Sequence, residues 1–439
     1  MKTIFRSFSA AAIFAAVIVL GAVTGFGQNP CEDADGQAKL DAAFRSNYQT
    51  AKPVADRKVA LESGKQYLEK YGSCDGPTKE FSDYLKGYLP KLEASIKSQE
   101  NKIRIDAIVN RFLDGMKSKN WDDVFASGKQ LIAENPDDYR AVELVLGSIG
   151  LDETAKSPRV TKWNDETLRY AKQSIADMEA GKTFKTYGIF VKDGANFQYK
   201  DKGDALGWMN YTVGFILSVD KNNKKDGASY LYKAAQAQSD TKSNPVVYEW
   251  IGAYYFDDAK KLIGEVRTLA AEQKTLQDGV SSTDTPEVKQ QKLDAIKAKS
   301  EQVKAKVGVL NGTLERAMDA YSRAYTFAPD TAAGKSYKDS IKATLGQLYN
   351  VRFEKTDGLD AYVKAVAAKP LPDPSTAITP ILDQDTTTTT TTTTSTKPIT
   401  PAAKPGAVVK PQSETRTSTK SASVSNALNN KAVAKKGMK

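Results

Sequence analysis

Apolar side chains recur every three to four residues along most of the chain from Gln28 to Pro370, and this spacing predicts a succession of amphipathic helices. Two of these helical stretches contain the same four-residue sequence, because Ser63–Gln66 and Ser127–Gln130 both read Ser-Gly-Lys-Gln. The repetition suggests that the chain is built from recurring helix-turn-helix units.

The clearest unit lies between Ala317 and Pro329. Ala317, Tyr321 and Ala324 share one helix face, where two small side chains allow a neighbouring helix to approach and the tyrosine fills the space between them. Arg323 is expected on the outer face, and Pro329 cannot continue the helix. This stretch resembles the second helix of a tetratricopeptide repeat, whose pattern is alanine, aromatic, alanine and a closing proline.

Further copies of the pattern occur elsewhere in the chain. The second-helix spacing recurs in Ala228, Tyr232 and Ala235. The first-helix pattern of an aromatic residue, an aliphatic–glycine pair and a second aromatic residue is matched by Tyr248, Ile251, Gly252 and Tyr255, and in shorter form by Leu345, Gly346 and Tyr349 and by Leu146 with Gly147. The resemblance implies an all-α fold, an irregular solenoid of tetratricopeptide-like helical pairs that these residues pack together.

An unrelated helical array is the alternative, because the units do not follow the uniform spacing of about 34 residues that the repeat has. Gly64 and Gly128 also stand where the repeat has its aromatic residue. The resemblance implies that exposed first-helix positions line a concave surface that binds a protein or peptide. These predicted groove positions are Glu249, Ala253, Phe256, Asp257, Gln347 and Asn350. The lysine and asparagine clamp by which some such repeats hold a C-terminal carboxylate is missing from them.

A β-hairpin is expected within the helical array. Residues 187–199 have alternating apolar side chains around Asp193 and Gly194, a pair that is typical of a tight hairpin turn. We interpret this hairpin as a surface excursion between helices, with a binding tip as the alternative.

A helical hairpin is expected between about Asp257 and Leu314. Apolar residues at helical spacing mark its first helix, and Pro286 after a polar turn is a typical start for the second. From Ile296 to Ala317 the apolar positions alternate at four and three residues, the stripe of a coiled-coil seam. The two helices should run antiparallel, and their many lysines and glutamates should be solvated.

The composition changes at Leu371. The segment 371–439 includes nine consecutive threonines at 386–394 and few large apolar side chains, so we expect it to be disordered. It holds nine basic and four acidic side chains, and four of its last nine residues are lysines. These charges predict a solvated tail, or weak contact with an anionic polymer or membrane surface.

The start of the chain resembles a secretory signal. Lys2 and Arg6 precede an apolar run that ends in small residues around Phe26, which predicts removal of residues 1–27 and export to the periplasm or cell envelope. An uncleaved membrane anchor is the alternative. An oxidising compartment would favour a disulfide between the only two cysteines, Cys31 and Cys74, over two free thiols.

The sequence offers little catalytic chemistry. Without histidine, the Ser-His-Asp triad, the Cys-His pair and the common zinc sites are excluded, so no metal is expected. Glycine-rich phosphate and dinucleotide loops are missing from the sequence, so no cofactor is expected. The net charge of +10 lies largely at the two chain ends, which gives no support to a specific nucleic-acid partner.

The sequence therefore predicts an exported scaffold, not an enzyme, that binds a protein or peptide partner in the cell envelope. The alternative is a structural envelope protein whose basic tail contacts cell-wall polymer or an anionic membrane surface. The expected order of parts is a signal (1–27), helical repeats with the β-hairpin (28–256), the helical hairpin (257–314), a last repeat (315–370) and the tail (371–439).

Overall fold

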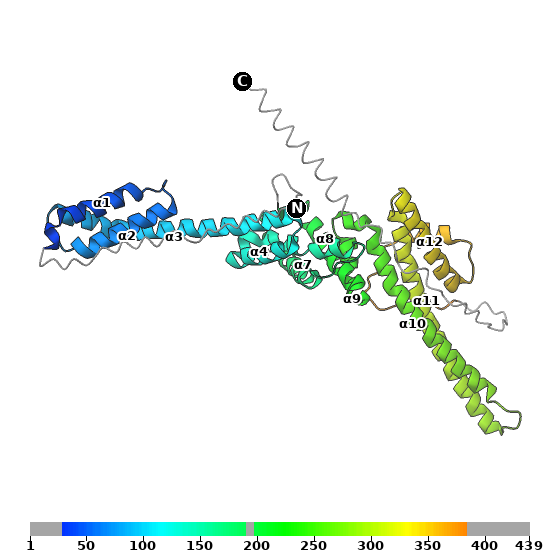
Figure 1. The fold of residues 1–439 in the computed structure, drawn as a ribbon. Coiled ribbons are helices and arrows are strands. Elements are labelled where there is room, and N and C mark those ends of the chain that lie inside the picture. Colours follow the sequence, from blue (N-terminus) through cyan, green and yellow to red (C-terminus); the bar gives the residue numbers. More distant parts are fainter. Residues whose placement is uncertain (1–28, 190–196, 384–439) are drawn as a thin grey trace, which may run out of the picture. The chain divides into compact units, whose positions relative to one another are not determined.

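The computed structural model describes residues 29–189 and 197–383. These residues form successive helices and one small antiparallel sheet, so the predicted all-α class is confirmed. Figure 1 shows the order of the helices along the chain. Contacts divide the chain into two compact units, Met1–Ala107 and Ile108–Lys439. The expected signal and the threonine run lie outside the described residues.

The first unit contains a short 3-10 helix followed by three α-helices: η1 (Pro30–Glu32), α1 (Ala34–Asn47), α2 (Val54–Tyr71) and the first part of α3 (Pro77–Ser118). Asp33 begins α1, because its carboxylate accepts a hydrogen bond from the backbone N–H of Gly36. The apolar faces of the helices meet in a core that includes Phe44, Tyr67, Tyr71, Leu85 and Leu89.

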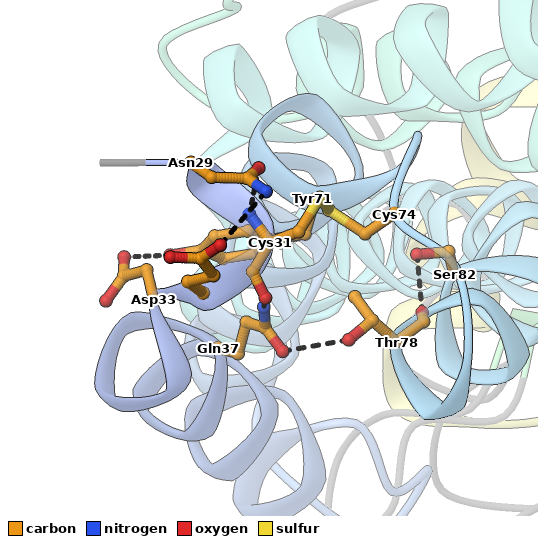
Figure 2. The surroundings of a disulfide bond; sticks show 9 residues. Asn29, Cys31, Asp33, Gln37, Tyr71, Cys74, Thr78 and Ser82 are labelled. Carbon is orange, nitrogen blue, oxygen red and sulfur yellow. Dashed lines mark hydrogen bonds between the residues drawn. A yellow bond between two sulfur atoms is a disulfide. The ribbon is translucent and has the colours of Figure 1, made fainter. Parts of the chain in front are cut away.

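Cys31 and Cys74 form a disulfide within this unit, as predicted. Figure 2 shows that the disulfide joins the short helix before α1 to the residues that follow α2. Beside it, the Tyr71 hydroxyl donates a hydrogen bond to the Asp33 carboxylate at 2.5 Å. The first described residues are therefore held by a covalent bond to the residues after α2 and by a charge-assisted hydrogen bond to its last residue.

The second unit begins with the end of α3 and continues through α4 (Trp121–Glu134), α5 (Pro136–Leu146), α6 (Ile149–Thr154) and α7 (Asn164–Glu179). Asn120 and Asn135 start α4 and α5, since their side chains accept hydrogen bonds from N–H groups of the first turn. At Gly147, directly after α5, a Cβ atom would lie 2.8 Å from the backbone nitrogen of Ala171 in α7. A glycine at this position therefore permits a close helix contact.

The remaining helices follow as three consecutive pairs: α8 (Lys202–Val219) with α9 (Lys224–Gln236), α10 (Pro245–Asp278) with α11 (Pro286–Phe327), and α12 (Ala332–Phe353) with α13 (Leu359–Ala367). A 3-10 helix, η2 (Asp240–Ser243), precedes α10. Both α12 and α13 pack against α11. The shared core of these pairs includes Tyr211, Tyr255, Leu314, Tyr321 and Leu345.

The predicted β-hairpin is confirmed by two short strands. β1 (Gly188–Ile189) and β2 (Phe197–Gln198) pair antiparallel, with Gly188 opposite Gln198. The turn at 190–196, which contains the Asp-Gly pair, lies outside the described residues. At the base of the hairpin, Tyr199 is buried in a core that it shares with α7 and α8.

The predicted helical hairpin is formed by α10 and α11, which pack along each other. Both helices continue without interruption through the expected boundaries at 257 and 314. Across the hairpin, Lys299 pairs with Glu272 at 2.8 Å. The hairpin is therefore the outer part of the α10–α11 helix pair, because both helices run through the boundaries without interruption.

The predicted start of the tail is too early. Residues 371–383 are not helical, and they lie against α11, where Leu371 and Ile378 join the apolar core. The composition of the segment did not indicate this contact with α11, because its few apolar side chains are mixed with prolines and polar residues. Residues 384–439 lie outside the described part of the chain.

Arg323 does not lie on an outer face, contrary to the sequence-based expectation. Its guanidinium is buried, pairs with Asp319 at 2.7 Å and donates a hydrogen bond to the backbone oxygen of Val366 at 3.2 Å. The helical periodicity could not show that α13 covers this side of α11. Among the described helices, none has both the length and the hydrophobicity needed to cross a membrane.

Candidate functional site: two surfaces around α10 and α11

Glu249, which the resemblance predicts to be exposed, is half-buried and links two of the helices that the resemblance assigns to the concave surface. It lies on α10, where its carboxylate accepts a hydrogen bond from the Tyr337 hydroxyl of α12 at 3.0 Å. Burial raises the pKa of Glu249 to about 7, and the bond from Tyr337 offsets only part of this effect. Within the described residues, no lysine or arginine pairs with this carboxylate.

Tyrosine side chains surround this carboxylate. Burial raises the pKa values of both Tyr321, on α11, and Tyr337, and the negative charge of Glu249 raises both further. Tyr211, on α8, also contributes to the shift at Tyr337. Helices α8, α10, α11 and α12 therefore place aromatic rings and one carboxylate close together.

The other predicted groove positions on α10 have mixed environments. Ala253 was expected on an accessible surface, but its side chain is buried. Asp257 pairs with Lys224 of α9 at 2.5 Å, and Lys260 lies 4.1 Å from the centre of the Phe256 ring. A charged and aromatic strip therefore continues along α10 beyond Glu249.

The predicted groove positions on α12 differ in how far they are exposed to solvent. Gln347 is half-buried, and its side-chain oxygen is buried without a hydrogen bond among the described groups, whereas Asn350 is exposed. Gly346 was expected to pack closely against a neighbouring helix, but a Cβ atom there would meet nothing within 4 Å. The glycine of the sequence pattern is therefore not a packing residue in this helix.

The predicted packing residues of α10 and α11 do come together. Tyr248, Ile251, Gly252 and Tyr255 are buried, as are Ala317, Tyr321 and Ala324. A Cβ atom at Gly252 would lie 2.9 Å from the ring of Tyr321, so only glycine allows this ring to lie across α10. The helix α11 ends two residues before Pro329, as expected.

The corresponding positions in α9 follow the same pattern less closely. Ala228 and Ala235 are buried, and Tyr232 is half-buried against the same core. In α12, Leu345 and Tyr349 are buried. The small and aromatic residues of these patterns in α9 to α12 are therefore buried, apart from Tyr232 and Gly346, which are half-buried.

A second surface, on α11, was not predicted from the sequence. Gly308 and Gly312 lie four residues apart on this helix, and the segment 371–383 passes over them. A Cβ atom at Gly312 would lie 2.3 Å from the backbone oxygen of Thr379, and one at Gly308 would lie 3.2 Å from Cβ of Pro380. We call this surface the glycine face of α11.

Polar side chains beside the glycine face bind the main chain of the segment. The Asn311 amide donates a hydrogen bond to the backbone oxygen of Ile381 at 3.1 Å. The Arg316 guanidinium donates to the backbone oxygens of Thr376 at 3.0 Å and Ala377 at 2.8 Å. The segment is therefore held largely through its carbonyl groups.

Arg352 of α12 holds the end of the described segment. Its guanidinium is almost fully buried and donates two hydrogen bonds, each of 3.0 Å, to the carboxylate of Asp383. It also pairs with Glu315 of α11 at 3.0 Å. Such a bidentate pair fixes both the position and the direction of the segment.

The sequence did carry one signal for this surface. Two glycines four residues apart in a long helix are unfavourable unless something lies close to them, since each costs about 1 kcal/mol relative to alanine. The threonine run and the scarcity of large apolar side chains instead led to the prediction of a disordered tail. Among the described residues, no group of acidic or cysteine side chains is arranged to hold a metal ion.

Comparison of this chain with protein families, with curated proteins and with solved structures finds no match.

Proposed function

We propose that this chain is an exported, non-catalytic scaffold of tetratricopeptide-like helical pairs that binds an extended segment of a partner protein in the cell envelope. The observation that carries the proposal is the carboxylate of Glu249, which lies near tyrosines of α11 and α12 without a cationic partner in the described part of the chain. The packing of α8 with α9 and of α10 with α11 supports the repeat interpretation, whereas α12 and α13 both pack mainly against α11.

The close contact between Gly252 and Tyr321 is further support. In the repeat that the sequence resembles, a first-helix glycine and a second-helix aromatic residue occupy these two positions. Between them, α10 and α11 carry both patterns, although the hairpin extension separates the two along the sequence. The irregular spacing of the units then reflects an insertion at the hairpin tip rather than a different architecture.

The environment of Glu249 favours a partner with a basic side chain. A carboxylate beside aromatic rings attracts a lysine or arginine, through the charge and through the ring faces. The charged form of Glu249 is needed for this attraction, and its pKa is about 7. Binding of a cationic segment should therefore strengthen as the pH rises through neutrality.

A selection of random peptides against the full mature chain would test the proposal. We expect the selected peptides to contain lysine or arginine, to bind more tightly at higher pH, and to lose at least about tenfold in affinity with Glu249→Gln, since a charge-assisted contact contributes about 1.5–3 kcal/mol. The matched control is Glu272→Gln, an exposed glutamate of the same helix. Peptides without basic residues, or equal effects of the two substitutions, would contradict it.

One observation favours a second function, that of a structural spacer. Four of the last nine residues are lysines, which suits contact with cell-wall polymer or an anionic membrane. In that case, binding to the envelope would depend on the tail, and substitutions at Glu249 would leave it unchanged.

A further inference from the structure

The segment over the glycine face of α11 contains a sequence that occurs twice in the chain. Ile378–Pro380 reads Ile-Thr-Pro, and the same triplet recurs at Ile399–Pro401. A serine and a threonine stand shortly before both copies. The first copy is the part of the segment that lies closest to the two glycines.

The glycine face fits this triplet residue by residue. At Gly312, an added Cβ atom would lie 2.3 Å from the backbone oxygen of Thr379 and 2.9 Å from Cγ2 of Ile378. At Gly308, it would lie 3.2 Å from Cβ of Pro380. The missing side chains therefore leave a shallow recess whose shape matches an isoleucine, a threonine main chain and a proline.

The main-chain contacts around the recess do not depend on the side chains of the bound segment. The backbone N–H of Ile381 donates to the backbone oxygen of Gly308 at 2.9 Å, and Asn311 and Arg316 donate to carbonyl groups on either side of the triplet. Recognition of an extended peptide commonly combines such main-chain bonds, which give affinity, with shaped pockets, which give specificity.

We propose that the glycine face of α11 is a docking site for extended Ile-Thr-Pro segments, with Ile378–Pro380 as its occupant in the structure and Ile399–Pro401 of the same chain as a second, competing ligand. The proline in each triplet favours an extended main chain at the threonine before it. The inference does not depend on the proposed binding surface at Glu249, which lies on another helix.

The second copy should bind more weakly than the first. After the first triplet come Ile381, Leu382 and Asp383, of which Leu382 lies near Gly308 with its side chain largely exposed, and Asp383 pairs with Arg352. After the second come two alanines and a lysine, which supply neither the apolar contact nor the carboxylate. Both copies belong to one chain, so both act at a high effective concentration compared with any free peptide.

The test uses a labelled peptide of residues 375–383 and four full-length mature chains. One is the parent, one carries Ile378→Ser with Pro380→Ser, one carries Ile399→Ser with Pro401→Ser, and one carries all four changes. We expect weak binding by the parent, tighter binding when the first copy is altered, and binding at least about tenfold tighter again when both copies are altered, because removal of a tethered competitor has effects of this order. Equal affinity of the first-copy variant and the fourfold variant would overturn the role of the second copy.

Glycine substitutions in the fourfold variant identify the surface. Gly312→Ala should weaken binding of the peptide at least about tenfold, because the added methyl group occupies the position of the Thr379 main chain. Gly346→Ala is the matched control, since its helix leaves open space around that glycine. Equal affinity of the two glycine variants, or no binding by the fourfold variant, would overturn the docking site.

A measurement on the unaltered chain covers the case in which the fourfold variant does not fold. An excess of the peptide of residues 395–403 should accelerate hydrogen exchange at the Ile381 amide, whose bond to Gly308 would be broken by a competing segment. A scrambled peptide of the same composition should leave the exchange unchanged. Exchange that is insensitive to the 395–403 peptide would again overturn the proposal.

Discussion

At the residue scale, close helix contacts depend on small side chains, and Ala324 of α11 gives a direct test because it is fully buried. Ala324→Glu should lower the free energy of unfolding by several kcal/mol, since excess volume and an unpaired charge enter the contact. Ala298→Glu makes the same change at an exposed position of the same helix and should stay within about 0.5 kcal/mol. Hydrogen exchange of the amides in α11 to α13 would measure both. Equal losses of stability in the Ala324→Glu and Ala298→Glu variants would contradict the assigned packing face.

Glu249 should make the stability of the second unit depend on pH. Its pKa rises from 4.5 to about 7 on folding, so between these values the folded chain holds a proton that the unfolded chain has released. Stability is therefore lost as the pH rises through this window, by about 3 kcal/mol at most. Glu249→Gln removes the ionisable group, so the variant should gain stability relative to the parent as the pH rises.

Urea unfolding of the parent and of Glu249→Gln, at a pH near 5 and a pH near 8, measures this difference. Burial also raises the pKa of Glu143 to about 7, but Glu143 is present in both proteins, so its contribution cancels. A difference between the two proteins that is the same at both pH values would show that Glu249 does not titrate in this range.

The residues that were assigned wrongly share a cause. Arg323, Ala253 and Gly346 were placed from the periodicity of their own helices, which does not show where neighbouring elements lie. Arg323 is covered through its bonds to the chain around Val366, whereas a Cβ atom added at Gly346 would meet nothing within 4 Å. Periodicity identifies the apolar face of a helix, but it does not show which other elements cover the remaining faces.

At the scale of elements, the disulfide should act on the first unit alone. It closes a loop with a sequence separation of 43, and the chain-entropy relation gives about 4 kcal/mol for a loop of this size. Replacing both Cys31 and Cys74 by serine should therefore accelerate hydrogen exchange in α1 and α2. The control is the exchange of α8 to α13, which belong to the other unit and should be unaffected. Unchanged exchange in α1 would show that the disulfide is not needed there.

The segment 371–383 should behave as part of the folded body. A chain of residues 28–383 should keep the melting temperature of a chain of residues 28–439. A chain that ends after Pro370 loses Leu371 from the core and the partners of Arg316 and Arg352, and should melt at a lower temperature, since about 1 kcal/mol corresponds to roughly 2–4 °C in a domain of about 150–250 residues. Equal melting of the two truncated chains would mean that the segment contributes nothing to stability.

Secondary-structure elements were predicted correctly where the sequence of the element itself carried a pattern. The alternating apolar residues around 187–199 identified the β-hairpin, and the four-and-three spacing from Ile296 identified the long helix of the hairpin. The segment 371–383 was missed because it has no periodicity of its own, and its structure follows from a surface that another part of the chain supplies. Gly308 and Gly312, far away in the sequence, determine where it lies.

At the scale of the whole molecule, the division into two units was not predicted. Helix α3 continues through the boundary near Ala107 without a proline- or glycine-rich linker, and the only local signal is the run of polar residues at 97–102. Such a division depends on which helices contact one another across the molecule. The positions that line the candidate surface at Glu249 depend on the same contacts, which is why helical spacing alone gave only some of them.

The charge distribution of the whole molecule leads to the last prediction. Residues 384–439 hold nine basic side chains and two acidic ones, including lysines at 431, 435, 436 and 439. If the tail contacts an anionic surface, the full mature chain should bind vesicles that contain an acidic phospholipid and should not bind neutral vesicles. Each lysine near such a surface contributes about 1 kcal/mol, so replacing these four by glutamine should weaken binding by about a hundredfold or more. The binding should also fall as salt is added, because exposed charges are screened over about 8 Å at physiological ionic strength.

A chain that ends after Asp383 provides the control, since it keeps the described fold and lacks these charges. Binding by that shorter chain, or binding that salt does not change, would contradict the electrostatic role of the tail and would place any membrane affinity in the helical body.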